Sequence, residues 1–149
     1  MASFNKYNLF LKNQMNGGGG TAAKVIDFDT DTIKIMLTTS SYVPNAATHG
    51  TKADVTNEVS GSNYTAGGAT ITSPTLTEGS GTVTFDGADV TWTQHASGFT
   101  NARYAILYKS TGTDSTSPLI GYYDLATDQT NVGADYSIIF SSLGIVTWS

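Results

Sequence analysis

The chain of 149 residues has no cysteine, only three prolines and only two histidines. Without thiols it can form neither a disulfide framework nor a thiolate metal site, so durability has to come from packing or subunit assembly. Charged residues make up 13% of the chain, about half the usual share. Seven Lys and Arg against twelve Asp and Glu give a net charge of −5. This balance argues against nucleic acid as a partner, because phosphate binding depends on basic side chains.

Long apolar runs are also missing from the sequence. No stretch reaches the ~18 residues that a membrane-spanning helix needs, so no membrane partner is expected. The first fifteen residues carry Lys6 and Lys12 inside their apolar pattern, which is not the pattern of a secretory signal. The sequence therefore predicts a soluble protein without an export signal.

Hydroxyl residues replace the missing charge, with 24 Thr and 15 Ser beside 16 Gly. Thr is β-branched and packs well on a half-exposed sheet, so this composition favours an all-β fold. Apolar and polar residues alternate in eight short segments, which predict strands: 32–39, 69–76, 81–85, 88–94, 102–108, 119–124, 135–140 and 145–148. We expect an antiparallel, jelly-roll-like β-sandwich of about eight strands. Asp86-Gly87 is predicted to form the tight turn of a hairpin between 82–85 and 88–94.

The N-terminal segment has a different periodicity. Four apolar side chains recur at three- and four-residue spacing: Phe4, Tyr7, Leu11 and Met15. This spacing predicts a short amphipathic helix with Ser3 as its N-cap. The glycine run 17–20 ends the helix and predicts a flexible hinge. The sequence thus divides into a helical arm with its hinge, residues 1–20, and a β-sandwich domain, residues 21–149.

The strand pattern lapses between residues 43 and 68, apart from a predicted helical turn within 51–59. Loops of this length are usually functional. The N-terminal helix and this loop are the segments that the core of one sandwich explains least. We therefore expect them to contact partners through six side chains: Phe4, Tyr7, Leu11, Met15, Tyr42 and Tyr64.

Three aspartates at alternate positions match the first three ligand positions of a calcium-binding loop: Asp27, Asp29 and Asp31. Such a loop requires Gly at its sixth position and Glu at its twelfth, where this chain has Thr32 and Thr38. Solvated carboxylates on an incoming strand are the favoured interpretation. No metal and no cofactor are expected.

The two histidines, His49 and His95, lie in a loop and at a strand end. Neither has a serine and a carboxylate at a recognisable motif spacing, and no G-x-S-x-G motif accompanies them. We therefore expect no catalytic residue and a protein that is not an enzyme.

Several stretches together resemble a family of small virion structural proteins of tailed bacteriophages. These stretches are FNKYNLFL, DTIKIMLTTSSYVPN, SGSNYTAGGATI, ARYAILYKST and SPLIGYYDLA. The most specific parts are NYTAGG at 63–68 and RYA at 103–105 followed by PLIG at 118–121. The resemblance implies a capsid decoration, or cement, protein. Such a protein is assembled in the host cytoplasm, binds the major capsid protein on the outside of the head as a homo-oligomer, with a trimer favoured, and stabilises capsomer contacts.

Three other functions remain open from the sequence. The chain could belong to the tail or to the head-tail connector, whose ring components differ in symmetry. It could be a tail-tip module that binds a host receptor or glycan through exposed Tyr and Trp, which predicts an aromatic patch at one end. It could be a small virion hydrolase, which predicts a carboxylate within hydrogen-bond distance of His49 or His95.

Overall fold

The computed structural model describes residues 4–20 and 24–149. Ten strands form three antiparallel sheets, with one short α-helix and short 3-10 turns. The strands are β1 (Phe4–Lys6), β2 (Ile33–Thr38), β3 (Ala69–Thr70), β4 (Thr75–Gly79), β5 (Thr82–Asp86), β6 (Val90–Trp92), β7 (Ala102–Lys109), β8 (Leu119–Gln129), β9 (Tyr136–Ile138) and β10 (Val146–Trp148). The helical elements are α1 (Asn8–Met15), η1 (Gly17–Gly20), η3 (Lys52–Asp54) and η4 (Asp114–Thr116).

The largest sheet, called the main sheet below, has the strand order β1-β8-β7-β2-β3. Its centre is the antiparallel pair β2 and β7, in which Ile35 lies opposite Leu107 and Met36 opposite Ile106. All four of these side chains are buried. A strand that is covered on both faces is apolar at successive positions rather than at alternate ones, which explains the run IKIMLT.

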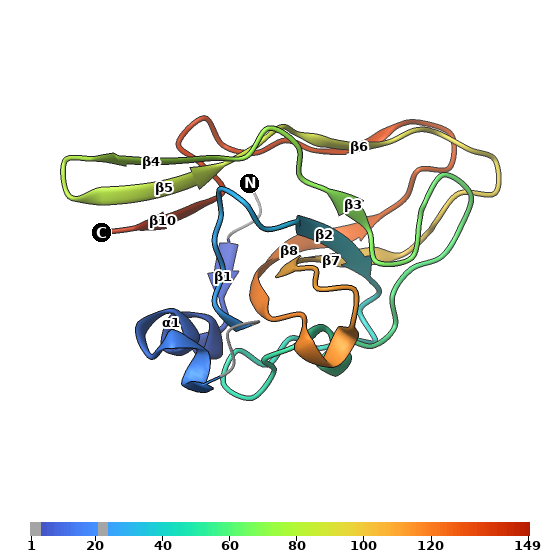
Figure 1. Ribbon diagram of the computed structural model, residues 1–149. Coiled ribbons are helices and arrows are strands. Elements are labelled where there is room, and N and C mark those ends of the chain that lie inside the picture. Colours follow the sequence, from blue (N-terminus) through green and yellow to red (C-terminus); the bar gives the residue numbers. More distant parts are fainter. Residues whose placement is uncertain (1–3, 21–23) are drawn as a thin grey trace.

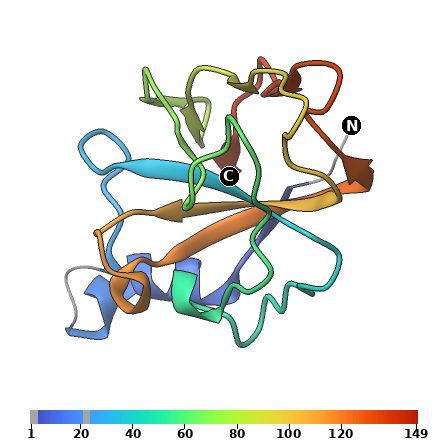
Figure 2. The ribbon, with the colours of Figure 1, turned by 90° about the vertical axis from the view of Figure 1, so that its right-hand side faces the viewer.

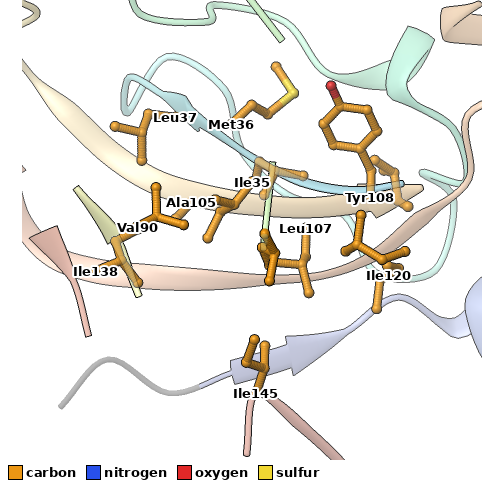
Figure 3. Close-up of a cluster of buried hydrophobic side chains, with 14 of the residues drawn as sticks. Ile35, Met36, Leu37, Val90, Ala105, Leu107, Tyr108, Ile120, Ile138 and Ile145 are labelled. Atoms are coloured by element: carbon orange, nitrogen blue, oxygen red, sulfur yellow. The ribbon is translucent and has the colours of Figure 1, made fainter. Parts of the chain in front are cut away.

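Each face of the main sheet is covered by other parts of the chain. The three-stranded sheet β10-β5-β4 and the pair β6-β9 lie on one side, and α1 with the 43–55 loop lies on the other (Figures 1 and 2). Figure 3 shows Val90 and Ile138, from β6 and β9, beside Leu37 and Ala105 of the main sheet. These side chains belong to one buried apolar cluster that links the sheets. The expected antiparallel β-sandwich is therefore confirmed.

The hairpin predicted at Asp86-Gly87 is wrong. β5 pairs with β4 on one side and β10 on the other, whereas β6 pairs with β9 in a different sheet. The tight turn lies one strand earlier, at Ser80 and Gly81, whose φ angles are 54° and 78°. Two successive positive φ angles are what a two-residue hairpin turn of type I′ requires. Asp86 instead accepts a hydrogen bond from the Gly87 N–H at 2.9 Å and turns the chain from one sheet to the next.

The predicted N-terminal helix begins too early, and it is not a separate arm. Residues 4–6 form β1, which pairs with β8 at the edge of the main sheet. The helix begins at Asn8 with Tyr7 as its N-cap, whereas the predicted cap, Ser3, lies outside the described residues. Tyr7 and Phe10 are buried in the common core. The segment before the glycines is therefore part of the sandwich, because it completes a sheet and contributes to the core.

The strand predicted at 69–76 is divided into β3 and β4, which belong to different sheets. Ser73, with φ of 52°, and Pro74 interrupt it, since a positive φ and a missing N–H both end a ladder. The helical turn predicted within 51–59 is present as η3, and a capping box between Thr51 and Asp54 holds it. In the part of the chain that the structure describes, no helix has the length and hydropathy needed to cross a bilayer.

Candidate interaction surface

An open apolar groove lies between α1 and the sheet β10-β5-β4. Its volume is about 590 Å³. The helix contributes Phe10, Leu11, Gln14 and Met15, the sheet contributes Leu76, Val83 and Trp148, and the segment after the glycine turn contributes Ile26, Asp27 and Phe28. We call this feature the α1 groove. Because apolar side chains form most of its lining while the groove stays open, it suits the apolar face of a partner.

Aromatic rings form the floor of the α1 groove. The ring of Phe28 lies 4.5 Å from Phe85, 5.4 Å from Trp148 and 6.0 Å from Phe10, measured between centroids. The Phe10 and Phe28 rings meet edge to face at 88°. Such tilted contacts are favoured because the positive edge of one ring meets the negative face of the other. These ring contacts pack the helix against the sheet at the floor of the groove.

Gln14 closes the end of the groove near the glycine turn. Its side-chain amide donates to the Ile26 carbonyl at 2.9 Å, and its Oε1 accepts from the Ile26 N–H at 2.8 Å. This pair of hydrogen bonds holds the returning chain beside the helix, so that Ile26 and Phe28 enter the core. The rim thus consists of an anchored helix on one side and the β4-β5 hairpin on the other.

The six predicted contact residues are split by the structure. Leu11 and Met15 line the groove and are 37% and 89% exposed, so they are available to a partner. Phe4 is half-buried on β1, with its ring 5.0 Å from that of Tyr123. The remaining three are Tyr7, Tyr42 and Tyr64, whose hydroxyl groups form hydrogen bonds inside the protein. The amphipathic pattern therefore identified one wall of the groove but not its other wall.

Tyr7 and Tyr42 form a buried hydrogen-bonded chain with His49. The two hydroxyl oxygens are 2.9 Å apart, and the Tyr42 hydroxyl lies 2.9 Å from His49 Nδ1. Burial raises the pKa of both tyrosines, so both stay protonated at neutral pH. The arrangement joins the start of α1 to the 43–55 loop across one face of the main sheet.

A carboxylate, Asp54, lies near His49 but is engaged elsewhere. Its Oδ2 accepts from the backbone N–H groups of Gly50 and Thr51, both at 2.9 Å. Burial acts to raise the pKa of Asp54, but these hydrogen bonds outweigh it and hold the pKa below its usual value. Asp54 therefore serves as the cap of η3. It is not hydrogen-bonded to the imidazole in the way that a hydrolase would require.

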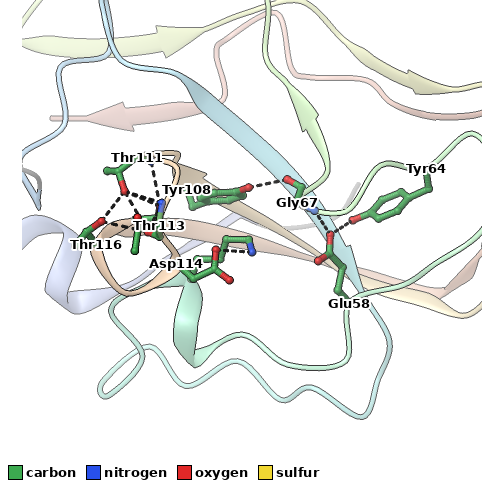
Figure 4. A network of polar contacts seen from close by, with 10 residues as sticks. Glu58, Tyr64, Gly67, Tyr108, Thr111, Thr113, Asp114 and Thr116 are labelled. Atoms are coloured by element: carbon green, nitrogen blue, oxygen red, sulfur yellow. Dashed lines mark hydrogen bonds and ion pairs between the residues drawn. The ribbon is translucent and has the colours of Figure 1, made fainter.

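Glu58 holds a second polar cluster together. Its Oε1 accepts from the Tyr64 hydroxyl at 2.8 Å and from the Gly67 N–H at 2.6 Å (Figure 4). The Tyr64 hydroxyl also accepts from the Leu37 N–H of β2 at 2.9 Å, and the Tyr108 hydroxyl donates to the Gly67 carbonyl at 2.7 Å. Burial raises the pKa of Tyr64, and the negative charge of Glu58 adds to this effect. The cluster fastens the 58–68 loop to the main sheet.

The aspartate series before β2 forms a turn. Asp27 accepts from the Asp29 N–H at 3.0 Å, and Asp31 accepts from the Asp27 N–H at 2.8 Å. Asp31 also forms an ion pair with Lys109 at 2.8 Å. Within residues 4–20 and 24–149, no three His, Cys, Asp or Glu side chains are grouped so as to hold a metal ion. The second histidine, His95, is exposed and accepts the Ser97 N–H at 3.0 Å.

The sheet wall of the groove was missed by the sequence analysis. Leu76 and Val83 come from the consecutive strands β4 and β5, Trp148 comes from the C-terminal strand β10, and the wrong hairpin paired β5 with β6. Knowledge of the β4-β5 pairing would have revealed the wall, because Leu76, Glu78, Val83 and Trp148 then share one face. Ser80-Gly81 was the available signal, as a two-residue turn between alternating segments.

The most exposed large apolar side chains in the described regions are aliphatic: Leu11, Met15, Val43, Leu76, Val132, Ile139 and Leu143. The two tryptophans, in contrast, pack against other rings. Trp148 is half-buried and lines the α1 groove together with Phe10 and Phe28. Comparisons of the chain with protein-family models, with curated proteins and with solved structures found no match.

Proposed function

We propose that this chain is a non-enzymatic virion structural protein of a tailed bacteriophage, a decoration protein that binds the outside of the head. Its partner in this proposal is the major capsid protein, and its role is to stabilise capsomer contacts as a homo-oligomer. The α1 groove is the observation that supports the proposal best. A decoration protein needs a rigid body with an apolar surface that is left open for a partner, and the groove combines both.

The groove is suited to holding a partner rather than to catalysing a reaction. Its lining is apolar except for Gln14, whose amide is already bonded, and Asp27. The side chains available to a partner, Leu11 and Met15, come from α1, a segment expected to make such contacts. Many copies on a shell would bind strongly even if each contact were weak, because the contacts act together.

A single substitution in the helix wall tests the role of the groove. Leu11→Gln keeps the length of the side chain but places an amide in the apolar contact. Burying a fully exposed leucine contributes about 1.5–3 kcal/mol, and Leu11 is 37% exposed, so loss of the part that a partner covers should weaken binding by roughly three- to sixfold. Leu143→Gln is the matched control, because Leu143 is 79% exposed and does not line the groove.

The assay is sedimentation of the purified chain with phage heads assembled without it. The wild type and Leu143→Gln should bind to saturation with equal affinity, whereas Leu11→Gln should bind more weakly. Equal binding by both variants would exclude the groove as the contact surface. Binding to isolated tails, with none to heads, would exclude the decoration role itself.

A further inference from the structure

β4 is an open edge of the sheet β10-β5-β4. All five of its residues are exposed, and the β4-β5 hairpin extends away from the main sheet (Figure 1). An exposed edge strand presents backbone N–H and C=O groups that can pair with another strand. The other edge, β10, is partly occupied, because the Thr147 carbonyl accepts from Lys6 Nζ at 3.3 Å.

The turn at Ser80-Gly81 determines which backbone groups of β4 are free. In a two-residue hairpin with two positive φ angles, the flanking residues form a hydrogen-bonded pair, here Gly79 and Thr82. Hydrogen-bonded and non-hydrogen-bonded pairs then alternate along the ladder. The N–H and C=O groups of Leu76 and Glu78 therefore point away from β5. In the part of the chain that is described, no hydrogen bond satisfies them.

We propose that two copies of this chain pair antiparallel through β4, with Thr77 of one copy opposite Thr77 of the other. In this register Leu76 of each copy lies opposite Glu78 of the second. Each of these pairs exchanges both backbone hydrogen bonds, so all the outward groups of Leu76 and Glu78 are satisfied. The contact is isologous, as in most homodimers.

Other registers of the same strand are worse. Shifting the centre to Glu78 places two glutamates directly opposite each other, which is destabilising on a sheet. Shifting the centre to Leu76 places Glu78 opposite Pro74, which has no N–H to donate. Only one register of β4 against itself thus satisfies the outward hydrogen-bonding groups and keeps the two glutamates from lying opposite each other. This self-complementarity favours a second copy over an unrelated strand.

The pairing would produce one continuous sheet across two molecules. Thr77, Thr84 and Thr147 lie in one cross-strand row, and pairing at Thr77 extends this row into the second copy. Cross-strand threonine pairs stabilise a sheet. The twofold axis is perpendicular to the sheet, so both copies present their α1 grooves on the same side. If the proposed function is correct, the dimer therefore grips the capsid at two points, whereas the pairing itself does not require the capsid.

A single cysteine tests the register, because the natural chain contains none. Thr77→Cys places two thiols in a non-hydrogen-bonded pair with Cα atoms about 4.5 Å apart, which is within the range of a disulfide. Thr75→Cys is the matched control on the same face of the same strand. In this register Thr75 faces Gly79 of the second copy, and the two Thr75 residues are roughly 13 Å apart along the strand.

The experiment is mild air oxidation of each purified variant without capsids, followed by non-reducing electrophoresis. Thr77→Cys should become a disulfide-linked dimer almost completely, and Thr75→Cys should stay monomeric. Equal cross-linking of both variants, or none of Thr77→Cys, would overturn the proposal. Because no capsid is present, failure here leaves the decoration role open, and failure of capsid binding leaves the dimer intact.

A second measurement does not depend on either cysteine variant folding correctly. By light scattering, the wild type should have twice the 15.6 kDa mass of one chain. Leu76→Pro removes an outward N–H that β4 does not use within its own sheet, so this variant should keep its circular dichroism spectrum and be monomeric. A monomeric wild type, or a Leu76→Pro variant that remains dimeric, would overturn the proposal.

Discussion

Removing single hydroxyl groups tests whether Tyr7 and Tyr42 belong to the interior, where the structure places them, or to a partner contact, as the sequence suggested. Tyr7 is 0% exposed, and its hydroxyl is bonded to that of Tyr42, which also reaches His49. Tyr7→Phe removes one hydrogen bond and leaves Tyr42 bonded to His49. The free energy of unfolding should fall by about 1 kcal/mol.

Tyr42→Phe should be more costly, because the hydroxyl of Tyr7 would remain buried without a partner in the described structure. The lost hydrogen bond and the unsatisfied hydroxyl together should lower the free energy of unfolding by about 2–4 kcal/mol. In the Tyr42→Phe background, Tyr7→Phe then removes the unsatisfied group and should cost nothing or stabilise. The two substitutions should therefore be strongly non-additive.

The assay is urea unfolding of the wild type, the two single variants and the double variant, followed by fluorescence and circular dichroism. Tyr104→Phe is the control, because the hydroxyl of Tyr104 makes no hydrogen bond within the described residues, and its effect should stay below about 0.5 kcal/mol. Additive effects of Tyr7→Phe and Tyr42→Phe, each no larger than that of Tyr104→Phe, would refute the buried hydrogen bonds between these tyrosines.

Two further predictions concern the backbone and pH. Gly68 has φ of 75°, and a Cβ there would meet the backbone of Ile35. Gly68→Ala should therefore lower the free energy of unfolding by about 3 kcal/mol or more, as measured by urea unfolding. An unchanged unfolding midpoint would contradict this close approach. The pKa of Asp54 is lower in the folded chain than in the unfolded chain. The ionised carboxylate therefore stabilises the fold fully at pH values above the unfolded pKa, and this contribution is lost as the pH falls through the folded pKa. In Asp54→Asn the free energy of unfolding should therefore fall less steeply at acid pH than in the wild type. An equally steep fall in both proteins would show that the hydrogen bonds from Gly50 and Thr51 do not stabilise the charged form of Asp54.

The fold class followed from local chemistry. Thr-rich alternating segments identified the positions of most strands, because β-branched residues and a period of two reflect the sheet directly. β2 and β7 were located almost to the residue, since their apolar runs are long and strong. Pairing was harder, because it depends on which segments meet in space. Asp86-Gly87 has the composition of a hairpin turn, yet the chain there passes between two sheets.

The N-terminal segment shows a second limit of sequence patterns. Phe4 and Tyr7 fit a helical period with Leu11, but Phe4 lies on a strand because the edge of β8 is available to pair with it. Tertiary pairing thus overrides a local period of only four apolar residues. The same limit applies to the groove: its helix wall was visible in the sequence, whereas its sheet wall required the pairing of β4, β5 and β10.

The position and orientation of the chain on intact virions test the central claim most directly. Electron cryomicroscopy of the virion that contains it would locate the β-sandwich by its main sheet and α1. The account predicts density on the outer surface of the head, with Leu11 and Met15 of the α1 groove facing the major capsid protein. Density in the tail or connector, or a head-bound chain whose α1 groove faces solvent, would contradict it.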